Sequence, residues 1–216
     1  HVGEPGSAVT WMNAWVEGKP VTPRIGMPIE INALWYNAIQ FSIEAASHLK
    51  DKEFIAEFSP IVKLIEASFP ETFFCAERDF IADVATQTKK DWSLRPNMIM
   101  AAALPYSPIS VSKRRRIIEL VRKDLLTPRG LRSLSPRDPS FIGKYQGNEN
   151  QRESSFHQGT VWPWMLEFLV QASFNLYGPS DIGFAEMVYN GFQDTMKEHG
   201  IGTISEVYDA DPPHKP

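Results

Sequence analysis

The chain contains 216 residues and carries a formal net charge of −4, so it is long enough for one substantial domain, expected to span residues 1–216. The acidic balance argues against a nucleic-acid partner, and no apolar run in the sequence approaches the roughly 18 residues of a membrane span. With one cysteine the chain cannot form an intrachain disulfide, which fits a reducing, cytoplasmic location.

Apolar residues recur at helical spacings from residue 29 onward. The pattern predicts a helix over Ile29–Leu49 and a second over Lys52–Phe69, in which Pro60 should begin or kink a helix. The first helix is expected to be buried along a stripe formed by Ile31, Leu34, Trp35, Ala38, Ile39, Ser42 and Ala46.

Further helices are predicted over Arg95–Leu104, Val111–Leu125, Val161–Tyr177 and Ile182–His199. The segment Val161–Tyr177 is apolar nearly all round, so it should be deeply packed, and Gly178 should end it. Ser180 is expected to cap the N-terminus of the last helix, which should end at Gly200. The basic run Lys113–Arg116 should form a solvated helix face.

The stretch from Asp124 to Phe156 lacks a periodic pattern. Its prolines, glycines and polar residues predict a long loop, and such loops in a compact domain tend to be functional or disordered. Because Leu and Phe are frequent within Leu125–Phe141, we expect an ordered loop that forms a pocket. Brief strands fit the residues around Glu71–Phe74 and Thr203–Tyr208. The pattern as a whole predicts an all-α domain.

The most distinctive segment is Ser154–Trp164, which reads SSFHQGTVWPW. It places a histidine, a glutamine and two tryptophans around a Gly-Thr turn. Aromatic faces cover the C–H surface of a pyranose ring while polar edges bond to its hydroxyls, so this mix is typical of a sugar site. An isolated Trp-Pro-Trp is more often part of a core. The same mix recurs at Thr10–Trp15, Thr22–Trp35, Asp91–Asn97 and Gly202–Asp211.

The order of these segments resembles the C-terminal domain of glycogen debranching enzymes, which carries amylo-α-1,6-glucosidase activity. The bacterial and archaeal members of that family have the most similar motif sequences. The shared motifs run from about Thr10 to the last residue and read TWM-x-A, TPRIGxPIEINALWYNA, DWSLRPN, LTPRGLRSLSPRDPSF, YQGN, SFHQGTVWPW and GTISEVYDADPPH. The resemblance implies a glucoamylase-like (α/α)6 barrel, a toroid of helix pairs, of which this chain would be the C-terminal half to two-thirds.

The resemblance also implies a reaction and its partners. The expected reaction is hydrolysis of α-1,6-glucosidic branch points, and the expected substrate is a branched α-glucan such as glycogen or a limit dextrin. A toroid that lacks helices would expose the surface between them. The remaining parts of the parent protein, or a second copy in a homo-oligomer, are therefore expected to cover the open toroid.

Acetal hydrolysis needs an acid for the leaving oxygen and a base for water, and inverting enzymes place the two groups about 6.5–9.5 Å apart. By the resemblance, Glu206 in GTISEVYDAD is the base. The family has an aspartate after TWM as the acid, and this chain has Asn13, whose carboxamide cannot donate the proton. Three interpretations stay open: hydrolysis is lost while glucan binding is retained, Glu30 acts as the acid, or the substitution was introduced or is lineage-specific.

Other side chains take binding roles by the resemblance. The residues expected to bind substrate are Trp11, Arg24, Trp35, Arg95, His157, Gln158, Trp162 and Trp164. Arg24 and Glu30 would hold sugar hydroxyls through charge-assisted hydrogen bonds. The tryptophans would form stacking walls, and one or two of them are expected to belong only to the core.

Supporting roles are expected for a few charged residues. Asp91 and Arg95 should form an ion pair that supports the pocket. Lys144, beside a turn, is a weaker binding candidate. Asp209 and Asp211 follow the expected base, and they either orient it or cap a turn.

The sequence gives no support for a cofactor. The five histidines are scattered, no His or Cys pair has metal-ligand spacing, and no Gly-rich phosphate loop follows a strand. Two other classes of function compete with a glycosidase. One is a non-catalytic glucan-binding module that keeps the pocket and loses turnover. The other is a toroid sugar epimerase that works through histidine bases, for which only His157 is placed.

Overall fold

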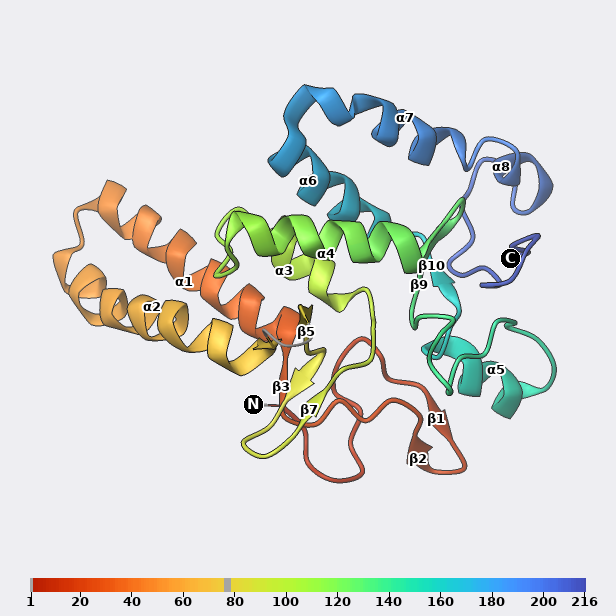
Figure 1. The fold of residues 1–216 in the computed structure, drawn as a ribbon, viewed down its shortest axis with the longest axis horizontal. Coiled ribbons are helices and arrows are strands. Elements are labelled where there is room, and N and C mark those ends of the chain that lie inside the picture. The colour runs from red at the N-terminus through yellow and green to blue at the C-terminus, as the bar shows by residue number, and fades with distance from the viewer. Residues whose placement is uncertain (1, 76–78) are drawn as a thin grey trace.

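The computed structural model describes residues 2–75 and 79–216, and the chain in it is rich in helix (Figure 1). The helices are α1 (Ile29–Leu49), α2 (Lys52–Phe73), α3 (Asn97–Ala103), α4 (Val111–Asp124), α5 (Glu149–Phe156), α6 (Met165–Tyr177), the 3-10 helix η1 (Gly178–Asp181), α7 (Ile182–Asn190) and α8 (Thr195–Glu198). The strands are β1 (Trp15–Val16), β2 (Lys19–Pro20), β3 (Met27–Pro28), β4 (Phe74–Cys75), β5 (Phe80–Ile81), β6 (Val84–Ala85), β7 (Lys90–Asp91), β8 (Leu126–Thr127), β9 (Gly130–Arg132) and β10 (Val161–Trp162). Helices dominate, but the strands correct the prediction of a purely all-α domain.

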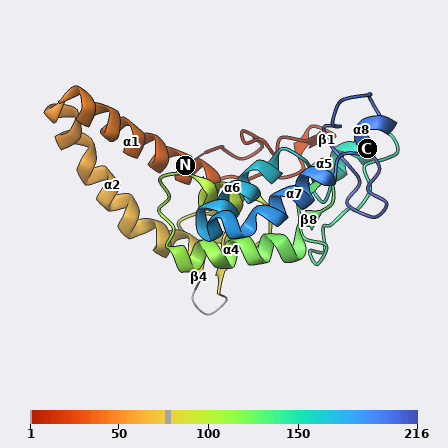
Figure 2. The same cartoon turned by 90° about the horizontal axis from the view of Figure 1, so that it is seen from above.

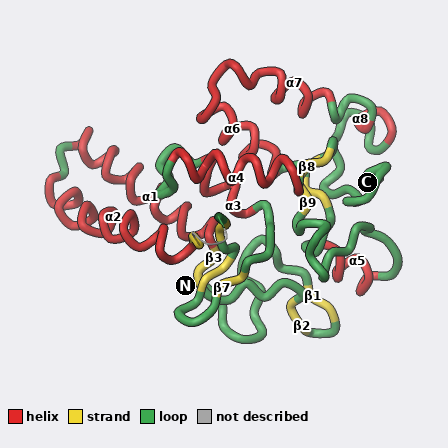
Figure 3. Tube along the Cα trace, viewed as in Figure 1, coloured by secondary structure: helices red, strands yellow, loops and turns green. Residues whose placement is uncertain are grey.

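The strands form small antiparallel sheets within the loop regions (Figure 3). β6 lies between β3 and β7, β9 lies between β8 and β10, and the pairs β1–β2 and β4–β5 stand alone. The strand expected around Glu71–Phe74 begins only at Phe74, because α2 continues to Phe73. The strand expected around Thr203–Tyr208 is reduced to a single bridge between Tyr208 and Val161.

The helices α1 and α2 form an antiparallel hairpin that projects at one end of the molecule (Figures 1 and 2). Lys50 ends α1 with a left-handed φ of 59°, and Asp51 caps α2 by accepting the backbone N–H of Phe54 at 3.0 Å. The prediction for α1 is confirmed at both ends. Pro60 neither begins nor ends a helix, because α2 continues through it.

The buried face of α1 differs from the predicted stripe. Its buried residues are Ile29, Glu30, Ala33, Tyr36, Ile39 and Ala46. Leu34 is 37% exposed and Trp35 is 56% exposed, so most of the predicted stripe faces outward. Tyr36 takes the inner position because its hydroxyl donates to Glu66 on α2 at 2.6 Å, which satisfies a polar group at the helix contact.

The core lies where α3, α4 and α6 pack together, near the centre of Figure 1. Every residue of α3 is buried, and α4 contributes Ile117, Ile118 and Val121 to the same cluster. The predicted helices Arg95–Leu104 and Val111–Leu125 are thereby confirmed, with shorter bounds for the first.

The apolar segment from Val161 onward forms both a strand and a helix. Val161 and Trp162 form β10, Pro163 follows, and α6 begins at Met165. The expected deep packing applies to one side only, since Phe174 is 42% exposed. Gly178 ends the helix with a φ of 62°, as predicted.

The last predicted helix, Ile182–His199, is interrupted between α7 and α8. Gly191 occupies the break, where an added Cβ would collide with the carbonyl oxygen of Pro128. The prediction that Ser180 caps this helix is wrong. Its hydroxyl instead donates to the carbonyl oxygen of Tyr177 at 2.6 Å.

The stretch from Asp124 to Phe156 contains more regular secondary structure than the long loop that was predicted. It contains the β8–β9 hairpin, whose second strand pairs with β10, and then helix α5. Figures 1 and 2 place β1, α5 and the C-terminal segment at the end of the molecule opposite to α1 and α2. None of the helices in the described ranges combines the length and apolarity needed to span a bilayer.

Candidate active site

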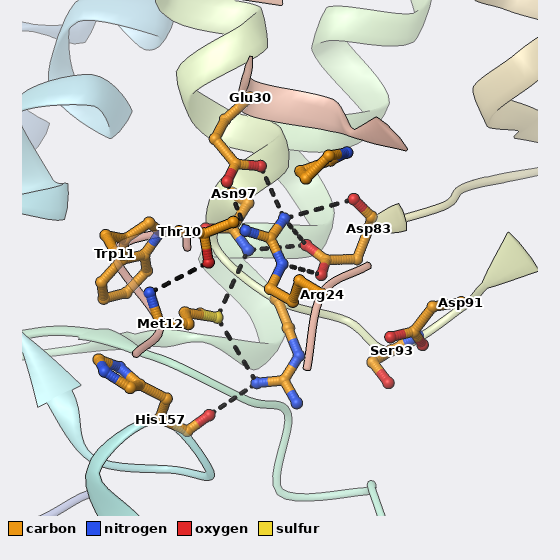
Figure 4. A network of polar contacts seen from close by, with 12 residues as sticks. Thr10, Trp11, Met12, Arg24, Glu30, Asp83, Asp91, Ser93, Asn97 and His157 are labelled. Carbon is orange, nitrogen blue, oxygen red and sulfur yellow. Dashed lines mark hydrogen bonds and ion pairs between the residues drawn. The ribbon is translucent and has the colours of Figure 1, made fainter. Parts of the chain in front are cut away.

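A buried ionic cluster lies where the loop before α1 meets β6 and α3 (Figure 4). The Arg24 guanidinium bonds to both carboxyl oxygens of Glu30, at 2.6 Å for Oε2, and its Nε donates to Asp83 Oδ2 at 2.7 Å. Asn97 Nδ2 donates to the other Asp83 oxygen at 2.7 Å. All four residues are at most 4% exposed, so one cation faces two carboxylates away from water.

Burial and charge act on this cluster in opposite directions. Burial raises the pKa of Glu30 above its usual range, and the charge of Asp83 adds to this, while the bonds from Arg24 oppose it. Burial disfavours the charge of Arg24, but Asp83 and Glu30 outweigh that penalty and raise its pKa. Because both oxygens of Glu30 accept from Arg24, this carboxyl does not face a substrate. The Glu30 carboxyl is therefore held by Arg24 inside the protein.

Arg95 holds three loop segments together. Its guanidinium donates to the carbonyl oxygens of Ser133 at 3.1 Å and His157 at 2.6 Å, and to Gln158 Oε1 at 2.7 Å. The expected ion pair with Asp91 is not formed, because that carboxylate accepts a backbone N–H two residues further along the chain. Arg95 is 4% exposed, so it holds these loops together from inside the protein.

A cluster of aromatic rings, formed by Trp11, His157, Trp162 and Trp164, adjoins the ionic cluster. The ring of Trp11 meets the other three edge to face, with centroids 5.1–5.4 Å apart. Its indole Nε1 donates to Asn97 Oδ1 at 2.7 Å, which joins the two clusters. Trp162 is 5% exposed and belongs to the core, whereas Trp164 is 40% exposed and can contact a ligand.

His157 is fully buried within the aromatic cluster. Its ring stacks on Trp162 with centroids 5.2 Å apart, and neither ring nitrogen has a hydrogen-bond partner among the described residues. Burial and the nearby charges of Arg95 and Arg24 lower its pKa to about 3. In this structure the ring of His157 packs against Trp11 and Trp162 and is shielded from solvent.

The two positions of the expected catalytic pair are exposed and attached to these clusters. Asn13 directly follows the buried Met12, whose sulfur lies 3.7 Å from Asn97 Nδ2. Glu206 lies on the segment that Tyr208 anchors, since the Tyr208 backbone bonds to Val161 on β10. Both positions are thus accessible on segments whose neighbouring residues are fixed.

The remaining predicted residues lie around this arrangement. Trp35 is exposed on α1 and is not part of the aromatic cluster. Asp209 accepts the Tyr145 backbone N–H at 2.7 Å, and the backbone N–H of Asp211 donates to the carbonyl oxygen of Gly143 at 3.0 Å. These bonds fasten the C-terminal segment to the loop that contains the exposed Lys144.

Sequence reasoning missed three members of the site. Met12 and Asn97 lie within the quoted motifs TWM-x-A and DWSLRPN, but nothing in residue type distinguished them from core residues. Asp83 gave the clearest signal, because it is a lone carboxylate between the apolar pairs Ile81–Ala82 and Val84–Ala85. A charged residue in such a run is expected to have a buried partner. Within the part of the chain that the structure describes, no three His, Cys, Asp or Glu side chains gather to hold a metal ion.

Comparison with known proteins gives the fold and the family of the chain. Among solved structures, neutral trehalase from Saccharomyces cerevisiae superposes with a TM-score of 0.66 at 12% identity, over 93% of this chain and 36% of that chain. The chain therefore has a helix-rich fold similar to that of this trehalase. A family model described as amylo-α-1,6-glucosidase matches residues 1–216. The chain belongs to the amylo-α-1,6-glucosidase family.

A curated relative agrees with this family. The glycogen debranching enzyme of Saccharomyces cerevisiae is 24% identical over 217 residues, which cover 80% of this chain and 14% of that protein. The chain thus spans a small part of the length of that relative.

Proposed function

We propose that this chain is the glucosidase domain of a debranching enzyme and hydrolyses α-1,6 branch points in glycogen-like glucans. The observation that carries the proposal is the family match over residues 1–216 combined with the exposure of Glu206, which corresponds by motif to the base of the family. A general base must reach a water molecule beside the substrate. The exposure of Glu206, on the segment that Tyr208 anchors to β10, supports this role.

The proposed mechanism is inverting, with Glu206 activating water from one side of the sugar. The opposite side needs a proton donor, and Asn13 at that position has no proton to give. Glu30 does not replace it, because its carboxyl is 1% exposed and bonded to Arg24 through both oxygens. We therefore propose that Asn13 limits hydrolysis in this chain. Asn13 also favours the alternative function, a catalytically impaired module that binds glucan.

The proposed architecture is a partial (α/α)6 barrel completed by other surfaces. Apolar side chains on two helices face outward, with Phe41 of α1 63% exposed, and with Met187 54% and Tyr189 73% exposed on α7. Soluble proteins seldom leave many such side chains uncovered on neighbouring turns. We propose that other parts of the parent protein, or a second copy of it, cover them. The cytoplasmic location stays a prediction.

Glucose release from a branched limit dextrin by the full-length protein tests the proposal. Glu206→Gln should reduce release to background, while Glu186→Gln, which removes an exposed carboxylate from α7, should leave it unchanged. Quenching of tryptophan fluorescence by the same dextrin reports binding separately. Binding without glucose release would support the binding module, and a wild type that neither binds nor hydrolyses the dextrin would contradict both functions.

A further inference from the structure

A polar pocket lies at the N-terminus of α5, outside the ionic and aromatic clusters. Its volume is about 430 Å³, within the range of small-ligand sites. Its polar lining consists of Lys144, Gln146, Asn148, Asn150, Gln151 and Ser154. Five of these six side chains are exposed, and all six lie on the loop before α5 or on α5 itself.

The cap of α5 fixes the orientation of two of these amides. Asn148 Oδ1 accepts the backbone N–H of Gln151 at 3.0 Å, and Gln151 Oε1 accepts the backbone N–H of Asn148 at 2.9 Å. Because both amide oxygens face the backbone, both NH₂ groups are left as donors, and neither donates to a described residue. The pocket therefore presents oriented donors that a ligand can use.

The walls of the pocket are bonded to the candidate active site. The backbone N–H of Ile142 donates to the carbonyl oxygen of Gln158 at 2.6 Å, and that of Tyr145 donates to Asp209, three residues after the proposed base. Helix α5 packs against β1, which begins two residues after Asn13. Figures 1 and 2 both show β1, α5 and the C-terminal segment gathered at one end. The pocket is thus connected to both segments of the proposed catalytic pair.

We propose that this pocket binds the glucan chain that carries the branch, as a subsite for the part of the substrate that is not released as glucose. This inference rests on the proposed function, since it takes the ligand to be an α-glucan. Sugar hydroxyl oxygens are acceptors that match the amide donors and the Lys144 ammonium. Glu149 and Glu153 on the same helix offset the charge of Lys144, so a neutral chain fits better than an anion.

The double substitution Asn148→Asp and Gln151→Glu tests the proposal while keeping the cap. Aspartate and glutamate accept the same backbone N–H groups, and both are favoured at these helix positions, so the cap is kept while two NH₂ donors are lost and two negative charges are added. The matched control is Asn190→Asp with Gln193→Glu, an exposed and mutually bonded amide pair outside the pocket, which changes the charge equally. The affinity of the full-length protein for maltoheptaose, a linear α-glucan, is measured by calorimetry.

We expect the pocket variant to bind maltoheptaose about tenfold more weakly than wild type, because it lacks two donors, and the control to bind normally. Asn150→Ala, which does not touch the side-chain cap, should weaken binding about threefold, and it serves as the test if the double variant unfolds.

Unchanged affinity in a folded pocket variant, an equal loss in the control, or no binding by wild type would overturn the proposal. If wild type binds maltoheptaose but neither wild type nor Asn13→Asp releases glucose from a dextrin, the hydrolase function fails while the subsite stands. If it releases glucose and the pocket variants bind normally, the subsite fails while the function stands.

Discussion

Replacing Arg24 by methionine would remove the cation that faces two buried carboxyls. Arg24 is 4% exposed, and its side chain forms ion pairs with Glu30 and with Asp83. Methionine has a comparable length and fills much of the same space, but leaves both carboxyls without a cation. Removing one partner of a buried ion pair costs about 3–5 kcal/mol, so we expect the free energy of unfolding to fall by about that amount at pH 8.

The same substitution should cost less in acid. Burial and the charge of Asp83 raise the pKa of Glu30 above 4.5 in the folded protein, and the bonds from Arg24 oppose that rise. A carboxyl with a raised folded-state pKa stabilises the fold fully below its unfolded pKa, and that contribution is lost as the pH rises through the folded pKa. Without Arg24 the pKa of Glu30 should rise further. A larger share of this carboxyl is then protonated at pH 5 than at pH 8, so the loss of stability should be smaller at the lower pH.

Urea unfolding of wild type and Arg24→Met at pH 5 and pH 8 measures both effects. Arg116→Met is the control, because the side chain of Arg116 is 43% exposed and those of its partners Asp79 and Glu119 are 76% and 54% exposed. Exposed pairs contribute about 0–1 kcal/mol, so this control should change stability little at either pH. A loss below about 1 kcal/mol for Arg24→Met at pH 8, or an equal loss at both pH values, would refute the reasoning.

Two further substitutions test the packing of the site. His157→Phe should leave the thermal midpoint unchanged or raise it, because the buried imidazole has no hydrogen-bond partner and an apolar ring avoids a penalty of about 1–3 kcal/mol; a fall of the midpoint by several degrees would show that the imidazole forms a necessary bond. Gly159→Ala should destabilise the fold by more than about 1 kcal/mol in urea unfolding, since Gly159 has a φ of 151° and its added Cβ would collide with the carbonyl oxygen of Ile142, and a neutral result would contradict this close approach.

The sequence predicted the helices well where periodicity was strong. The bounds of α1 agree at both ends, because the left-handed Lys50 and the cap at Asp51 reinforce the apolar pattern. Its buried face was predicted wrongly. An apolar pattern shows that Leu34 and Trp35 are hydrophobic, but it does not show whether they pack against this chain or against another surface. The choice of Tyr36 as an inner residue depends on Glu66, thirty positions away, and local pattern contains no such information.

The candidate site was predicted as a set of residues but not as a geometry. Trp11, Arg24, Arg95 and His157 do come together, as the recurring motifs indicated. Their roles differ from the prediction, because burial decides whether a polar side chain meets the ligand or the protein. The sequence could not reveal that Asp83, on a separate strand, would complete the ion cluster, since that contact depends on β6 pairing with β3.

The most direct test of the account is glucose release from a branched limit dextrin by the full-length protein with Asn13→Asp. A missing general acid typically lowers the rate by about 10²–10⁴-fold, so this substitution should raise glucose release by at least about a hundredfold over wild type. Adding Glu206→Gln should return release to background. If Asn13→Asp releases no more glucose than wild type, while the variant folds and binds dextrin normally, the assignment of these two positions as the catalytic pair is contradicted.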